Sequence, residues 1–330
     1  MSTARPTVIV LAAGQGTRMR SRWPKVLHEA AGKPLLEHVL RAARELDPET
    51  IAIVVGHGAD AVRERFADAG VTFVDQPHQR GTGDAVACSA AAIAARRGPF
   101  VVLSGDGPLV TAASLRRALA AHAAAGGEGM TLVTYEVEDP TGLGRVVRGP
   151  DGRVRAIVEE RDADAATRAL REVNPGTYVF DQRLWSLLGE LDDDNAAGEV
   201  YLTDLVAAYV RTGLPVRAER SDDETRLLVG VNDRAQLALA DRLLRDRLRQ
   251  HWLTAGVTMV DPGSVYLDDT VELAPDVTLE PGVVLAGATR IGEGATVGAF
   301  AHLTDCAVGA GARVGPHTVA SGRSFPTPTD

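Results

Sequence analysis

A loop of small residues near the start of the chain carries groups that could bind a polyphosphate. Residues 11–19 read Leu-Ala-Ala-Gly-Gln-Gly-Thr-Arg-Met, and Pro24-Lys25-Val26-Leu27 follows shortly after. Small residues let backbone amides come close to phosphate oxygens. Arg18 adds a forked guanidinium and Lys25 adds an ammonium, and both groups bind phosphate well.

Two commoner phosphate-binding motifs do not fit these residues. A dinucleotide fingerprint needs a third glycine at the position of Met19, and a Walker loop ends in Gly-Lys-Ser/Thr, which is missing here. A tight strand-to-helix turn with two surface cations is the structural alternative, and it is the better explanation for the glycine pair alone. Arg18, together with the Pro24-Lys25-Val26-Leu27 segment that follows the loop, favours a ligand-binding role for this loop.

The same residues resemble a known family. The pattern Leu-x-Ala-Gly-x-Gly-Thr-Arg-Met, then Pro-Lys-Val-Leu-His and Gly-Lys-Pro, is similar to that of the nucleotide-sugar pyrophosphorylases. Over nearly the whole chain, the likeness is to the bacterial bifunctional N-acetylglucosamine-1-phosphate uridyltransferases/glucosamine-1-phosphate acetyltransferases. The resemblance implies that Arg18 and Lys25 are catalytic. It also implies a substrate-binding role for the residues at the start of the loop, which are Leu11, Ala12, Ala13 and Gly14.

A second group of residues suits the edge of a nucleobase. Gln76 offers a donor and an acceptor on one amide, and Gly81 and Thr82 follow it closely. A helix cap with a flexible loop is an equally good explanation of these residues alone. The resemblance implies that they contact uracil. The family usually has His where this chain has Asp84, which alters the charge of the loop.

A third group suits a divalent cation. Asp106 lies in Ser104-Gly105-Asp106-Gly107-Pro108-Leu109, after an apolar strand, and one carboxylate is enough for a Mg²⁺ that shares phosphate oxygens. A helix-capping role for Asp106 is the alternative, but Thr111 and Ser114 can cap that helix. Taken alone, Asn232 is most simply explained as the N-cap of the predicted connecting helix. The resemblance implies that Asp106 and Asn232 ligate Mg²⁺ and that Ser104 and Gly105 bind substrate, although Gly107 replaces a larger residue.

A fourth group suits the hydroxyls of a sugar. Gly144, Glu159 and Asn174 combine close backbone with neutral and acidic acceptors, although a turn and solvated polar residues explain each of them singly. The resemblance implies that these three residues bind the sugar, and it places Tyr201 or Thr203 nearby. Leu143 replaces the usual aromatic residue and Pro175 replaces a small one, so the sugar pocket is expected to differ in shape.

The resemblance implies a Mg²⁺-dependent uridylyltransferase. UTP and N-acetylglucosamine 1-phosphate would give UDP-N-acetylglucosamine and pyrophosphate. Both reactants are ionised, so positioning and charge neutralisation matter more than a general base. We expect Arg18 to neutralise the pyrophosphate and Lys25 to hold the sugar-linked phosphate. Two alternatives stay open: a different sugar 1-phosphate or nucleoside triphosphate, and a non-catalytic sugar-nucleotide-binding subunit.

Composition excludes several classes of protein. The 330 residues carry a formal net charge of -9, which argues against a nucleic-acid or membrane partner. Cys88 and Cys306 are far apart and indicate no disulfide framework or metal site. No signal peptide is recognised at the start of the chain, and the apolar run 8–13 is too short to span a bilayer. A cytoplasmic location is expected.

The elements that must position these groups alternate between strand and helix. This pattern predicts a Rossmann-like α/β fold, with a mostly parallel or mixed sheet and helices on both faces. A hairpin follows, with Gly149-Pro150-Asp151-Gly152 at its turn. The strands are expected at 8–10, 51–55, 71–74, 101–103, 131–135, 145–147 and 154–158, and the helices at about 34–46, 59–68, 84–96 and 111–125.

The pattern changes in the last third of the chain. We predict a nucleotidyltransferase domain over 1–232, a connecting helix over 233–253, a hexapeptide-repeat β-helix over 254–320 and a disordered tail over 321–330. Apolar residues recur every six positions from Met259 to Val283, again from Ile291 to Leu303 and again from Val308 to Val314, which gives about three coils. The resemblance implies a left-handed helix that assembles as a trimer. Because the family's acetyl-coenzyme A site lies in later coils, we expect no acetyltransferase activity from this chain.

Overall fold

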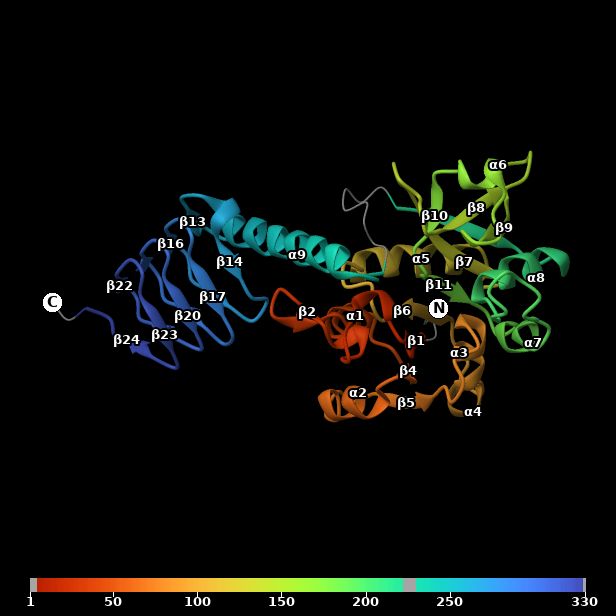
Figure 1. Ribbon diagram of the computed structural model, residues 1–330, viewed down its shortest axis with the longest axis horizontal. Helices are drawn as coiled ribbons and strands as arrows, with labels where there is room; N and C mark the ends of the chain where they lie inside the picture. Colours follow the sequence, from red (N-terminus) through yellow and green to blue (C-terminus); the bar gives the residue numbers. More distant parts are fainter. Residues whose placement is uncertain (1–4, 222–229, 329–330) are drawn as a thin grey trace. The chain divides into compact units, whose positions relative to one another are not determined.

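The computed structural model describes residues 5–221 and 230–328, which form two compact units (Figure 1). The first unit comprises Met1–His28 and Leu35–Arg234, and the second comprises Glu29–Pro34 and Ala235–Asp330. The second unit includes the short segment 29–34, which lies within the domain predicted over 1–232, and the first unit includes residues 233–234 of the predicted connecting helix. No helix among the described residues has both the length and the apolarity needed to cross a bilayer.

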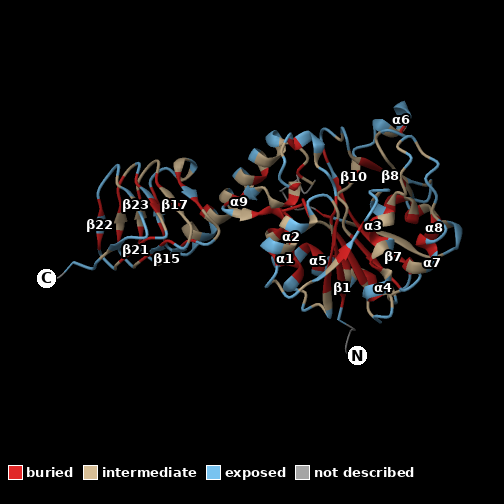
Figure 2. Ribbon diagram, turned by 60° about the horizontal axis from the view of Figure 1, so that its bottom comes forward, coloured by how far each residue is buried: buried red, intermediate tan, exposed pale blue. Residues whose placement is uncertain are grey.

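A ten-stranded mixed sheet forms the centre of the first unit, in the order β5-β4-β1-β6-β11-β7-β10-β8-β9, with β12 paired to β7. Helices lie on both sides of it, and the buried residues concentrate in its strands (Figure 2). The strands are β1 (Thr7–Ala12), β4 (Thr50–Val55), β5 (Thr72–Asp75), β6 (Phe100–Ser104), β7 (Met130–Glu136), β8 (Gly144–Arg148), β9 (Val154–Val158), β10 (Glu172–Asn174), β11 (Tyr178–Phe180) and β12 (Val216–Arg220). The helices are α1 (Leu35–Arg44), α2 (Ala59–Arg65), α3 (Thr82–Cys88), α4 (Ala90–Ile93), α5 (Ala112–Ala124), α6 (Ala165–Arg168), α7 (Leu184–Leu188) and α8 (Leu205–Arg211).

Strand β1 lies in the middle of the parallel part of this sheet. Its apolar residues 8–10 are fully buried, as expected for a strand covered on both faces. β1 pairs with β4 on one side and with β6 on the other, and Leu11 lies opposite Ser104. The loops that follow β1 and β6 therefore leave the same edge of the sheet, where open α/β sheets bind ligands.

Strand β11 makes the sheet mixed and is missing from the sequence-based prediction. It runs antiparallel to both β6 and β7. Three residues are too few to show a period of two, so the sequence gives little signal for this strand. Its aromatic residues explain its place in the core, since the rings of Tyr178 and Phe180 are stacked with centroids 5.5 Å apart, and Phe180 stacks on Tyr209.

The second unit contains α9 (Arg234–Thr254) and three four-stranded parallel sheets, which form a short β-helix. The sheets are β13-β16-β19-β22, β14-β17-β20-β23 and β15-β18-β21-β24, so the helix has four coils rather than the three predicted. Strand β24 (Ser324–Phe325) pairs with β21, so the tail predicted from residue 321 is wrong for these residues. The six-residue count missed this coil because Val319 points outward and Ala320 takes the inward position.

The short hairpin of β2 (Glu29–Ala30) and β3 (Lys33–Pro34) is part of this second unit. The backbone N–H of Ala31 donates to Asp241 Oδ1 over 2.7 Å, and Lys33 Nζ lies 2.7 Å from the carboxylate of Asp269. Gly32 has a φ of 76°, and a Cβ at this position would collide with the carboxylate of Asp268. Helix α1 begins only after this hairpin, at Leu35 rather than near residue 34.

Candidate active site

Glycine shapes the loop after β1. Gly16 has a φ of 61°, and a Cβ at this position would lie 2.7 Å from Lys25 Cβ. The loop can therefore pack directly on the stem of Lys25 only because residue 16 has no side chain. Met19, which is 1% exposed, anchors the short helical turn that carries Arg18.

Lys25 connects this loop to the two predicted metal ligands. Its Nζ forms an ion pair with the carboxylate of Asp106, and it donates to Asn232 Oδ1 over 3.1 Å. The side chains of Lys25 and Asp106 are only 14% and 11% exposed. The second oxygen of Asp106 accepts a hydrogen bond from Ser104 Oγ over 2.7 Å. Three segments far apart in the sequence, around residues 25, 106 and 232, thus meet at the ammonium of Lys25.

Backbone contacts fix Asp106 and Asn232 relative to each other. The N–H of Val231 donates to the carbonyl of Asp106 over 2.9 Å, and a Cβ on Gly230 would collide with the carboxylate of Asp106. Asn232 Nδ2 donates to the carbonyl of Gly230 over 2.9 Å, which leaves Oδ1 facing Lys25. Thr111 caps α5 by accepting from the N–H of Ser114, so Asp106 is not the cap of that helix.

The oxygens of Asp106 and Asn232 can hold a divalent cation. A carboxylate and an amide oxygen are the hard ligands that Mg²⁺ prefers, and here both face one positive group, the ammonium of Lys25. Among the described residues, no group of three or more His, Cys, Asp or Glu could enclose a metal on its own. A two-ligand site suits Mg²⁺, which commonly completes its octahedral shell with water and substrate phosphates.

A cavity of about 210 Å³ opens beside this cluster. It contains residues from all four predicted groups, at the carboxyl edge of the sheet. The predicted residues that line it are Leu11, Thr82, Ser104, Asp106, Gly144, Glu159, Asn174, Thr203 and Asn232. The residues that were not predicted as ligand contacts are Gly142, Leu143, Pro175, Gly176, Tyr178, Leu202 and Gly230.

Acceptors and hydroxyls face one another within this cavity. Thr203 Oγ1 donates to Glu159 Oε1 over 3.1 Å, and Asn174 Nδ2 donates to the hydroxyl of Tyr178 over 2.5 Å. A Cβ on Gly144 would lie 3.3 Å from Glu159 Oε1, so glycine leaves this carboxylate accessible. Tyr178 is 3% exposed and lies on β11, which explains why sequence reasoning missed it.

Burial governs the ionisation of the acidic side of this cavity. Burial raises the pKa of Glu159, and the nearby carboxylates of Asp204 and Asp162 raise it further, while the hydrogen bond from Thr203 opposes them. Burial also raises the pKa of Tyr201 to about 12. Glu159 therefore retains a proton to a higher pH than an exposed glutamate does.

Of the three predicted base-binding residues, only Gln76 lines a second cavity of about 590 Å³, together with Gly56, His57, Asp75, Pro77 and Gln79, whereas Thr82 lines the first cavity and Gly81 lines neither. Gln76 is 5% exposed, and its Nε2 donates to the carbonyl of Gly81 and to Asp84 Oδ2. Gln79 Nε2 donates to the carbonyl of Ala13 over 3.0 Å, so Gln79 ties the glycine loop to this cavity. No sequence motif pointed to Gln79.

The other predicted residues line neither of these two cavities. Ala12 and Ala13 are buried behind the loop, and Gly14 is exposed, where an added Cβ would meet no described atom within 4 Å. Gly105 packs on the carbonyl of Leu11, and Tyr201 precedes the turn that carries Thr203. Arg18 is exposed, and within the described residues it has no hydrogen bond or ion pair.

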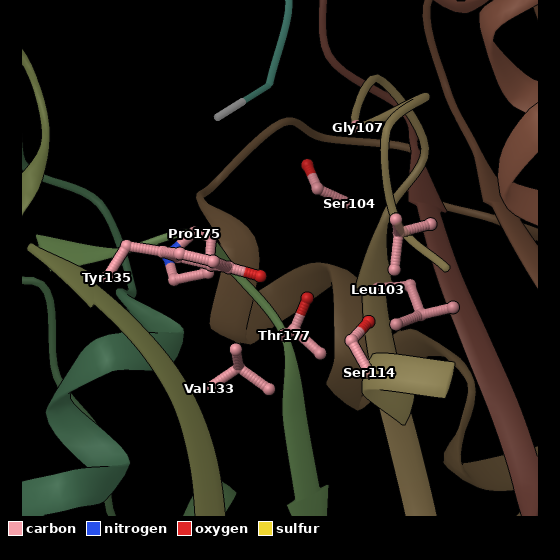
Figure 3. A pocket seen from close by; sticks show the side chains of 9 residues that line it. Leu103, Ser104, Gly107, Ser114, Val133, Tyr135, Pro175 and Thr177 are labelled. Atoms are coloured by element: carbon pink, nitrogen blue, oxygen red, sulfur yellow. The ribbon is translucent and has the colours of Figure 1, made fainter. Parts of the chain in front are cut away.

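A small internal void lies next to Ser104 (Figure 3). Its volume is about 10 Å³, close to the minimum for one water molecule. Hydroxyl groups of Tyr135, Thr177 and Ser114 line it, and so do Gly107 and Pro175. Gly107 and Pro175, two of the three residues that depart from the family pattern around the metal and sugar groups, therefore lie at one place.

Comparisons with known proteins identify the family of this chain. A family described as the MobA-like NTP transferase domain matches residues 8–257. Bifunctional protein GlmU of Thermus thermophilus is 48% identical over 314 residues, covering 95% of this chain and 68% of that protein. The GlmU proteins of Kineococcus radiotolerans and Streptomyces coelicolor are 50% and 47% identical, and this chain covers 63% and 67% of them. The chain thus spans about two thirds of these relatives.

A solved structure shares the fold. The crystal structure of UDP-glucose pyrophosphorylase complexed with UDP-glucose aligns with 74% of this chain and 99% of its own, with a TM-score of 0.61. The sequences are only 18% identical, so this likeness shows the fold alone.

Proposed function

This chain belongs to the GlmU family and is a nucleotidyltransferase, and on that premise we propose that it forms UDP-N-acetylglucosamine and pyrophosphate from UTP and N-acetylglucosamine 1-phosphate. The observation that carries the proposal is that Lys25 contacts both Asp106 and Asn232, which line the same cavity as Glu159 and Asn174. The former group suits phosphates and a metal, and the latter suits a sugar.

The reaction joins two ionised substrates. An oxygen of the sugar phosphate attacks the α-phosphorus of UTP, and pyrophosphate leaves, so no strong general base is needed. Asp106 and Asn232 would hold Mg²⁺, which would neutralise charge on the phosphates. The chain itself contributes orientation, because the backbone contacts at Gly230 and Val231 hold both ligands before substrates arrive.

Lys25 and Arg18 supply the remaining positive charge. The buried ammonium of Lys25 lies beside the sugar cavity, so we assign it to the sugar-linked phosphate. Arg18 is exposed on the turn after Gly16, and we assign it to the leaving pyrophosphate, which its forked guanidinium suits. Neither cation needs to transfer a proton.

The sugar cavity presents groups that match hydroxyls and an amide. Glu159 accepts, Asn174 and Thr203 can both donate and accept, and Gly144 allows a close approach of backbone. The uridine part of the proposal is supported by the match of Gln76, Gly81 and Thr82 to the residues that the family pattern assigns to uracil. Leu143 and Pro175 shape the cavity wall and make the choice of sugar the first point to test.

The test is pyrophosphate release by the purified chain with UTP, Mg²⁺ and a panel of sugar 1-phosphates. N-acetylglucosamine 1-phosphate should give the highest kcat/KM, and Asp106→Asn is the inactive control. A higher kcat/KM with another sugar phosphate or another nucleoside triphosphate would replace the substrate assignment. Saturable binding of sugar nucleotides without pyrophosphate release would favour a non-catalytic subunit.

We also propose that these 330 residues have no acetyltransferase activity of their own. His302 and His317 are the only histidines after residue 254, and both are exposed. His317 stacks on Phe300 with ring centroids 5.3 Å apart. Incubation with acetyl-coenzyme A and glucosamine 1-phosphate should release no thiol above background, and saturable thiol release would overturn the proposal.

A homotrimer through the β-helix is the assembly that we propose. One outward face of this unit carries Tyr266, Val284, His302 and Val319 in register, here called the Val319 face. The corresponding residues on the other two sheets are mostly threonines or charged and small polar residues. Val319 is 79% exposed, which is unfavourable for an isolated chain.

We also propose a cytoplasmic location, since Cys88 and Cys306 are unpaired.

A further inference from the structure

The amide of Gln76 is held between two groups that can only accept hydrogen bonds. Its Nε2 lies 3.0 Å from the carbonyl oxygen of Gly81 and 2.8 Å from Asp84 Oδ2. An ionised carboxylate and a backbone carbonyl have no proton to give. The nitrogen end of the amide must therefore face these two oxygens, because the reverse orientation would place three acceptors together.

The two acceptors are themselves fixed in place. Gly81 packs against Val200, and a Cβ on Gly81 would collide with the carbonyl of Val200. The N–H of Gly83 donates to that same carbonyl over 2.8 Å, and the N–H of Val200 donates to the carbonyl of Arg80. These bonds fix the backbone of residues 80–83, which holds Asp84 beside Gln76 at the start of α3.

The oxygen end of the amide has the opposite character. No donor bonds Gln76 Oε1 within the described residues, although the side chain is 5% exposed. Gln76 lines the 590 Å³ cavity at the carboxyl ends of β4 and β5. Its backbone N–H donates to the carbonyl of Val55 over 2.8 Å, which fixes the residue at that edge of the sheet. Gln76 Oε1 is thus a hydrogen-bond acceptor at a fixed position beside this cavity.

We propose that Asp84 is a positioning residue for base selection, which holds Gln76 Oε1 toward the base so that it accepts from the ring N3–H of uracil. Cytosine carries an acceptor at N3, so it would face the same oxygen without a proton between them. This inference rests on the proposed use of UTP. According to this inference, Asp84 makes the site prefer UTP to CTP. Without Asp84, the amide of Gln76 could rotate to suit either base.

The first test uses the unmodified chain. UTP that carries a methyl group on N3 should have a kcat/KM lower than that of UTP by about tenfold or more, because the methyl group removes the donor. Equal use of the two nucleotides would overturn the proposal. If the chain used no uridine nucleotide at all, the proposed function would fail instead, so the two failures are distinguishable.

The second test changes residue 84. In Asp84→Asn, the new amide can donate or accept, so Gln76 is free to turn, and the ratio of kcat/KM for CTP to that for UTP should rise about tenfold. Calorimetric binding of CTP and UTP should show the same change in ratio. Asp84→Glu keeps the carboxylate and should keep most of the preference for UTP. An unchanged ratio in Asp84→Asn would overturn the assignment.

A matched control comes from the same cavity. Asp75 also lines it, but its carboxylate pairs with Arg63 over 2.8 Å. Asp75→Asn removes the same charge and should leave the ratio of CTP to UTP unchanged. A change in both variants would show a general effect of charge and would overturn the specific role of Asp84.

Discussion

The amide oxygen of Asn232 lies 3.1 Å from the ammonium nitrogen of Lys25, although 207 positions separate them in the chain. The same ammonium pairs with the carboxylate of Asp106. Lys25 therefore contacts both residues that are proposed to hold Mg²⁺. A metal ion and this ammonium would compete for the same oxygens, since two positive charges at that distance repel each other.

Lys25→Met should strengthen metal binding and weaken catalysis. Without the ammonium, the affinity for Mn²⁺ in the absence of nucleotide should rise about tenfold, while kcat falls about a hundredfold. Paramagnetic resonance of free Mn²⁺ measures the first effect. Lys33→Met is the control, because Lys33 pairs with Asp269 in the second unit. Weaker Mn²⁺ binding in Lys25→Met would contradict the competition.

Asp106→Asn should lower kcat sharply and leave the fold intact. The substitution keeps the shape of the side chain and removes the charge that a divalent cation needs, so a loss of about a hundredfold or more is expected. Ser104→Ala removes one hydrogen bond to Asp106 and should cost only about tenfold. Pyrophosphate release and thermal melting measure the two effects. Similar rates for Asp106→Asn and the wild type would remove the metal assignment.

Glu159→Gln should stabilise the fold and impair sugar binding. Because burial raises the pKa of Glu159, the folded chain holds this proton more tightly than the unfolded chain does, and stability falls as pH rises through the folded pKa. The glutamine variant should therefore gain about 1 kcal/mol near pH 8, and less near pH 4. Urea unfolding at the two pH values measures this. KM for the sugar phosphate should rise, and an unchanged KM would exclude Glu159 from the sugar site.

Val319→Arg should shift the chain from trimer to monomer. The substitution places a charge on β23, at one end of the Val319 face, where burying it against a partner would cost several kilocalories per mole. Ala307→Arg is the control, since Ala307 is exposed on a different sheet of the β-helix. Light scattering at high micromolar concentration gives the mass. A wild-type chain that is only monomeric would contradict the proposed assembly.

Arg18→Ala should lower kcat more than it raises the KM for the sugar phosphate, because Arg18 is assigned to the leaving pyrophosphate. Arg22→Ala removes a second exposed arginine of the same segment and should have little effect. Steady-state kinetics with each substrate varied in turn separates the two parameters. A change confined to the KM of the sugar phosphate would exchange the roles assigned to Arg18 and Lys25.

The parts of the fold that follow local patterns were predicted well. The buried run of β1, the turn between β8 and β9 and the repeat of the β-helix all have strong local periods, and the structure contains them. Strand β11 was not predicted, because its three residues owe their place to ring packing against distant side chains. The fourth coil was missed because its inward residue is a small Ala320.

The candidate site also has some features that the sequence predicts and others that it does not. Asp106 and Glu159 stand out in the sequence as polar residues at the ends of apolar strands, and both line one cavity. The hydrogen bond from Gln79 to Ala13 and the ion pair of Lys25 with Asp106 depend on how loops meet in space. No local pattern encodes such meetings, and the roles of these residues stay predictions until they are measured.

The hairpin formed by residues 29–34 has a consequence for the order of events during synthesis. Its partners Asp241, Asp268 and Asp269 leave the ribosome more than 200 residues after it does. At about 5–20 residues per second, the hairpin waits roughly 10–50 s for them. The sheet of the first unit can form during this delay, and the segment between Lys25 and α1 reaches its folded position last. A ribosome stalled before residue 241 should therefore display a protease-sensitive site at this hairpin, and one stalled after the first coils should not.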